Sequence, residues 1–83
     1  MQDRKALAKR CDKIRDRLLD RAVRTAVAGP IDPALVLAVG AASINCEVLD
    51  RPAHPLSEAQ LDLVAGFVRI TESQLDSGQA PWN

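Results

Sequence analysis

Five prolines divide this chain of 83 residues into three segments, each long enough to form a helix. They lie in two close pairs and one position near the end: Pro30 with Pro33, Pro52 with Pro55, and Pro81. Proline ends or begins helices because its ring fixes φ and its nitrogen carries no hydrogen to donate. The sequence therefore predicts an all-α fold, a three-helix bundle in a single domain over 1–77, followed by a C-terminal tail over 78–83.

The predicted helices carry recognisable signals at their ends. The first, over about 2–28, stops at a Gly-Pro pair. The second opens at Asp32, an N-cap residue followed by proline at the first helical position, and continues past the uncharged segment 34–44. The third, over 57–77, begins with Ser57, which can form a capping box with Gln60.

The first helix carries a narrow apolar seam with 4-3-4 spacing, made of Leu7, Cys11, Ile14 and Leu18. This spacing is typical of a helix that meets one partner helix. At a rise of about 1.5 Å per residue, the first helix exceeds its neighbours in length, so its N-terminal half should project. A second copy of the chain is the simplest cover for the seam, since two-fold dimers are the commonest oligomers. We therefore predict a homodimer with these four residues at its interface. The alternative is a monomer with a frayed or folded-back first helix.

Apolar residues further along the chain predict deeper burial. Beyond Leu18 they spread over about half of the helix circumference, so the second half of the first helix should be more buried than the first half. Segment 34–44 contains no charged residue, which predicts a second helix enclosed on all sides. Small residues from Gly40 to Ser43 would let another backbone approach closely. A cavity floored by Gly40 and Ala41 would be the place to search for a small-molecule site.

The third helix has apolar residues on two sides, about 140° apart at the helical period. One group is Leu61, Val64, Ala65, Val68 and Leu75, and the other is Leu63, Phe67 and Ile70. A single neighbouring helix cannot cover both groups. Either the second group meets a partner, or Leu63 and Phe67 lie half exposed.

Charge is separated along the chain although the formal net charge is zero. Residues 1–28 hold nine Lys or Arg and four Asp, whereas 29–83 hold two Arg and seven acids. Six basic residues share one arc of about 120° on the first helix: Lys9, Arg10, Lys13, Arg17, Arg21 and Arg24. We expect these residues to form a solvated face on which some of them make ion pairs with Asp16 and Asp20, one helical turn away. An anion-facing surface for an acidic protein or for nucleic-acid phosphates is the alternative.

Residues that carry chemistry are few and scattered. Cys11 and Cys46 lie on apolar helical positions and are expected to be buried, inert thiols, the alternatives being a redox pair or a Cys11–Cys11 contact across a dimer. His54 lies on a proline-rich connector, where we expect exposure, and offers no zinc spacing. Ser43 should donate a hydrogen bond to a preceding backbone carbonyl, the alternative for Ser43 and Asn45 being a polar contact that sets the register of an oligomer. Trp82 either folds back onto the bundle, anchors a partner or is disordered.

These features predict a function exerted through surfaces. We expect a small, cytoplasmic, non-catalytic protein–protein interaction module without cofactor, metal or membrane segment: a regulator, inhibitor or accessory subunit of the kind that phages and plasmids carry. Its predicted partners are a second copy and a protein with an acidic surface. The predicted partner-binding residues are Arg10, Lys13, Arg17, Arg21, Arg24, Leu63 and Phe67. The alternatives are a nucleic-acid-binding helical dimer that uses the basic face of the first helix, and an enzyme or small-molecule binder.

Overall fold

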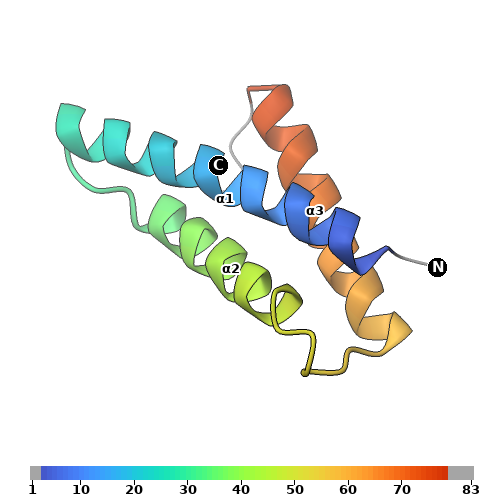
Figure 1. Cartoon of the computed structure of the whole chain (residues 1–83). Helices are drawn as coiled ribbons and strands as arrows, with labels where there is room; N and C mark the ends of the chain where they lie inside the picture. The colour runs from blue at the N-terminus through green and yellow to red at the C-terminus, as the bar shows by residue number, and fades with distance from the viewer. Residues whose placement is uncertain (1–2, 79–83) are drawn as a thin grey trace.

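The computed structural model describes residues 3–78, which form three helices: α1 (Arg4–Ala28), α2 (Pro33–Leu49) and α3 (Glu58–Asp76) (Figure 1). No strand occurs within this range. The predicted all-α, three-helix fold is therefore confirmed. From residue 79 onward the predicted tail, including Trp82, lies outside the described residues.

The helix ends form as the sequence predicts. The Asp32 carboxylate accepts a hydrogen bond from a backbone N–H in the first turn of α2. Ser57 and Gln60 complete the capping box, with the Ser57 Oγ 3.1 Å from the Gln60 N and the Gln60 Oε1 2.8 Å from the Ser57 N. After α3, Gly78 takes a φ of 78°, in the left-handed region that favours glycine. Asp3 supplies a further cap, and so α1 begins at Arg4.

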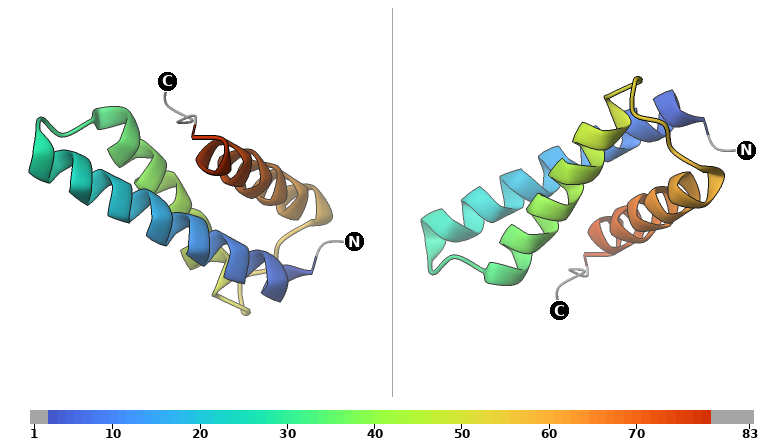
Figure 2. Two further views of the ribbon diagram at one scale, coloured as in Figure 1. Left: turned by 90° about the horizontal axis from the view of Figure 1, so that it is seen from above. Right: turned by 90° about the horizontal axis from the view of Figure 1, so that it is seen from below.

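Helix α1 is the centre of the molecule. Helix α2 returns antiparallel along it, and α3 then runs in the direction of α1 on another side (Figures 1 and 2). The α1–α2 interface is the more extensive of the two, and α2 and α3 touch each other little. Helix α3 ends where Asp76 pairs with Arg17, at about the middle of α1. Beyond this point, α1 and the start of α2 extend past α3 as a helical hairpin.

The apolar seam of α1 forms the core of a single chain. Its four residues are only 0–2% exposed. They share one cluster with side chains of both other helices, chiefly Leu35, Ala42, Cys46 and Leu49 of α2 and Leu61, Val68 and Leu75 of α3. The predicted dimer interface at Leu7, Cys11, Ile14 and Leu18 is therefore wrong, because these side chains have no surface left to offer a second copy. The connector between α2 and α3 returns the chain to the N-terminal end of α1, so both helices cover the half that was expected to project.

Two further burial predictions are also wrong. The second half of α1 is the less buried half, and its Leu19, Val23 and Val27 are all exposed. Helix α2 is not enclosed, since Leu37 and Ile44 are exposed on its outer side. The second half of α1 is exposed because α3 ends beside Arg17 and does not reach the far end of the hairpin. Helix α2 is exposed on its outer side because α1, and not α2, takes the central position.

The two apolar groups of α3 differ in burial within the chain. Leu61, Val68 and Leu75 are buried. Of the other group, Leu63 and Ile70 are exposed, and Phe67 is half-buried against the core.

Candidate interaction surface

The outer face of α2 is apolar and open to solvent. We define it by six uncharged residues within an arc of about 140° opposite α1: Val36, Leu37, Gly40, Ala41, Ile44 and Val48. Leu37 is 74% exposed and Ile44 is 67% exposed. The buried residues of the same helix, such as Leu35 and Cys46, lie on the opposite side. Helix α2 therefore has two apolar sides, of which the described residues 3–78 cover one.

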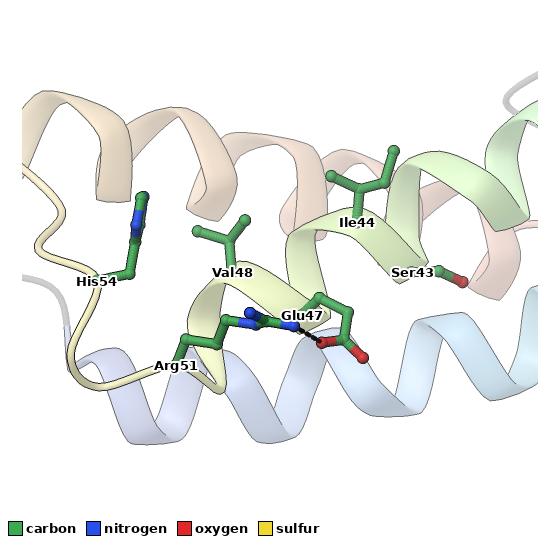
Figure 3. Close-up of a pocket in the computed structure, with 6 residues that line it drawn as sticks. All are labelled: Ser43, Ile44, Glu47, Val48, Arg51 and His54. Carbon is green, nitrogen blue, oxygen red and sulfur yellow. Dashed lines mark ion pairs between the residues drawn. The ribbon is translucent and has the colours of Figure 1, made fainter.

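Glu47 is the one charged residue of α2 within this arc, and its carboxylate lies 3.5 Å from the Arg51 guanidinium. Between this ion pair and the connector lies a shallow depression of about 540 Å³, lined by Ser43, Ile44, Glu47, Val48, Arg51 and His54 (Figure 3). Ile44 and Val48 point to the same side of the helix in this view. The C-terminal end of the outer face therefore adjoins a small polar edge.

Residues of the depression have local roles. The Ser43 hydroxyl donates to the Val39 carbonyl at 2.8 Å, as predicted. His54 is exposed, also as predicted, and residues 3–78 contain no group of three His, Cys, Asp or Glu that could hold a metal ion. At Gly40, the place named for a search for a small-molecule cavity, a Cβ atom would meet nothing within 4 Å. Gly40 lies on open surface.

The basic arc of α1 contributes to the packing of α3. Arg10 makes a two-pronged contact with Glu72, with its Nη2 2.6 Å from one carboxylate oxygen and its Nε 3.2 Å from the other. Hydrogen bonding to Glu72 raises the pKa of Arg10. Arg17 pairs with Asp76 at 2.9 Å. The charge separation between the two parts of the chain thus brings the basic side of α1 against an acidic edge of α3.

The ion pairs expected between the basic arc of α1 and its carboxylates Asp16 and Asp20 form only in part. Arg24 pairs with Asp20 at 2.9 Å, within α1. Arg21 also has an interaction partner, so it is not a free cation. Lys13 is exposed to solvent. Of the predicted partner-binding residues, Arg10 and Arg17 are thus engaged with α3, and the arc is not a continuous open surface.

Arg4 is an important residue that the sequence analysis missed. Its guanidinium donates to four backbone carbonyls, those of Val48 at 3.0 Å, Leu49 at 3.2 Å, Arg51 at 2.8 Å and His54 at 2.9 Å. Helix α2 leaves its last carbonyls without intrahelical partners, and a cation is favourable at that end. Arg4 therefore ties the start of α1 to the end of α2 and to the connector. No local pattern signals this contact, because it spans more than 40 residues.

The two cysteines are neighbours in the core. Their sulfur atoms lie 3.2 Å apart, and the Cys11 thiol also contacts the Ala42 carbonyl at 3.7 Å. Burial raises the pKa of the Cys11 thiol and, more strongly, that of Cys46. Both are free and buried, as predicted. A Cys11–Cys11 contact across a dimer is excluded by that burial, whereas their proximity was not foreseen.

No protein-family model matches this sequence, and comparisons with curated proteins and with solved structures give no match. None of the described helices is long and apolar enough to cross a bilayer. The exposed surfaces of the three helices are therefore the features that bear on function.

Proposed function

We propose that this protein is a small, non-catalytic protein–protein interaction module that forms a homodimer through the outer face of α2. The observation that carries the proposal is the exposure of Leu37 and Ile44 on a helix side with a single charged residue. Fully burying one such side chain contributes about 1.5–3 kcal/mol, which favours covering this side by a partner.

A second copy is the occupant that fits the charge of this face. A partner with charged groups would have to leave them desolvated against apolar side chains, at considerable cost. The outer face of another copy brings no cation, and it carries one acid at its edge that is already paired with Arg51. An isologous contact places the same surface on both sides, and this surface contains no central charge to repel its own copy.

An antiparallel contact with its two-fold axis near Gly40 and Ala41 makes the best use of these residues. Leu37 and Ile44 lie at similar distances on either side of that point, so Leu37 would pack against Ile44 of the partner subunit. The small residues at the centre would allow the two helices to approach closely. Glycine within a helix costs roughly 1 kcal/mol relative to alanine, and no contact among residues 3–78 requires a glycine at position 40.

The dimer would be a scaffold for a regulator, an inhibitor or an accessory subunit. Leu63 and Ile70 on α3 and Lys13 on α1 remain as exposed surface for a further protein partner. Nucleic-acid binding through the basic face of α1 is the weaker hypothesis, because Arg10 and Arg17 already pair with carboxylates of α3. Salt-dependent binding to duplex DNA or RNA would favour that hypothesis instead.

Sedimentation equilibrium of the full chain tests the dimer. We expect a mass of twice 9.0 kDa, with dissociation in the micromolar range that small interfaces show. Leu37→Glu should give the monomer mass with unchanged helicity. Leu63→Glu is the matched control, since Leu63 is 76% exposed and Leu37 is 74% exposed. If the unmodified chain stays monomeric at high concentration, or if only Leu63→Glu dissociates it, the proposed interface is wrong.

Gly40→Leu tests the proposed interface without the charge that Leu37→Glu introduces. The substitution adds apolar surface and fits the open space around position 40 within one chain. It should nevertheless weaken the dimer, because it would hold the two α2 helices apart. An unchanged dimer would show that the contact does not pass through Gly40, and a tighter dimer would show that the two helices do not approach closely there.

A further inference from the structure

The two cysteines form a pair that the proposed function does not use. Cys11 of α1 and Cys46 of α2 are 35 residues apart in the sequence, but their sulfur atoms are 3.2 Å apart in the core. A disulfide bond is about 2.05 Å long, so the sulfur atoms need to move by only about 1 Å to form one. Neither residue belongs to a metal-binding group within residues 3–78.

We propose that Cys11 and Cys46 are a site of reversible oxidation, at which a small disulfide such as oxidised glutathione converts the two thiols to a disulfide bond between α1 and α2. The proposal rests on the juxtaposition of the sulfur atoms inside one chain. It does not depend on the dimer, because both thiols lie on the sides of α1 and α2 that face each other.

The reaction proceeds by two exchanges. One cysteine, as the thiolate, attacks a sulfur of oxidised glutathione, forms a mixed disulfide and releases one glutathione thiolate. The second cysteine then attacks the protein sulfur of that mixed disulfide and releases a second glutathione. The protein loses two hydrogens as two electrons pass to the glutathione disulfide, which is reduced to two thiols.

The structure assigns the order of attack. Burial raises the pKa of both thiols, but the Cys11 thiol donates to the Ala42 carbonyl and the Cys46 thiol donates to the Cys11 sulfur, so Cys46 can offer a hydrogen bond to a thiolate at Cys11. Cys11 therefore attacks first, and Cys46 resolves the mixed disulfide. The Asp12 carboxylate opposes ionisation of both thiols, and Arg15 favours it.

Burial of the two thiols limits the rate of this reaction. Its equilibrium constant depends on how well the folded chain holds the two sulfur atoms together. Cys11 and Cys46 are 0% and 1% exposed, so glutathione reaches them only in an opened state of the chain, such as one in which α3 has detached and uncovered the seam. A disulfide between them closes a long loop, which restricts the unfolded chain more than the folded one. By linkage, the folded chain should favour the disulfide over the unfolded chain by roughly 500-fold.

The test equilibrates the full-length protein with glutathione buffers of increasing oxidised fraction, in native buffer and in concentrated urea. Acid quenching, alkylation of free thiols and intact mass then count the remaining thiols. We expect a monomeric product lighter by two hydrogens, an equilibrium constant several hundred-fold larger without urea, and a rise in Tm on the order of 15 °C. A small amount of urea should speed the reaction.

Cys46→Ala is the control, and it should stop at the mixed disulfide between Cys11 and glutathione. Cys11→Ala should react more slowly than Cys46→Ala if Cys11 attacks first. An equilibrium constant no larger in native buffer than in urea would overturn the proposal. Accumulation of stable mixed disulfides, or of disulfides between chains, in the unmodified protein would also overturn it.

Discussion

The two interfaces of α1 differ in kind. Against α2, α1 buries its apolar seam along much of the length of α2, with Arg4 bonding four carbonyls at one end. Against α3, the contact is shorter, and two partly exposed ion pairs, Arg10–Glu72 and Arg17–Asp76, lie along its edge. Apolar burial is the dominant stabilising contribution in folding, whereas exposed ion pairs each contribute about 1 kcal/mol or less.

This difference indicates that the α1–α2 hairpin is the stable unit of the fold and that α3 is the more easily detached helix. Helix α3 still matters for the core, since Leu61, Val68 and Leu75 complete the cover over the seam. Its loss would expose that seam.

Ile14→Asp should have the largest effect. Ile14 is 1% exposed within the core cluster, so the substitution buries a carboxylate without a partner. Proteins of this size have a free energy of unfolding of only roughly 4–12 kcal/mol. We expect most of the chain to lose its helical circular dichroism. A folded monomer would contradict this account, because it would show that the seam lies at the surface of the chain. Leu63→Asp, at an exposed position, is the control.

Arg4→Ala should lower the free energy of unfolding by about 1–3 kcal/mol, because four carbonyls lose a charged donor. Urea denaturation followed by circular dichroism measures the loss. Arg4→Lys should recover only part of it, since an ammonium group cannot reach four carbonyls with the geometry of a guanidinium. If Lys restores full stability, the charge near the end of α2 matters and the individual hydrogen bonds do not.

Removing the Arg10–Glu72 pair should have the smallest effect. We expect a coupling energy of about 0.5 kcal/mol in a double-mutant cycle of Arg10→Ala and Glu72→Ala, and a smaller one at high salt. The Arg10 side chain is 46% exposed and that of Glu72 is 30% exposed, so solvent screens the pair. A coupling energy above about 2 kcal/mol would show that this edge holds α3 as firmly as apolar packing holds α2.

Local signals predicted the elements of this fold well. The proline pairs, the Asp32 cap and the capping box at Ser57 each act within a few residues, so the sequence around them is sufficient. The separation between the apolar groups of α3 was likewise visible in its periodicity. Burial of Cys11 and Cys46 followed from their apolar positions.

The relative placement of the helices could not be predicted in the same way. The absence of charge in 34–44 suggested a central α2, but only the path of the connector decides that α1 is covered from two sides. The narrow seam from Leu7 to Leu18 has the same pattern whether its cover comes from one chain or from two. The contacts of Arg4, and the 3.2 Å approach of the sulfur atoms, join residues far apart in sequence. They depend on tertiary packing alone.

Native-state hydrogen exchange tests the difference between the two interfaces most directly. Amides of α2 and of the N-terminal half of α1 should exchange only through global unfolding. Those of α3 should exchange through a separate opening whose free energy is lower by at least about 1 kcal/mol. If the amides of α3 are protected as strongly as those of α2, the three helices unfold as one unit, and the α1–α2 hairpin is not the stable part of the molecule.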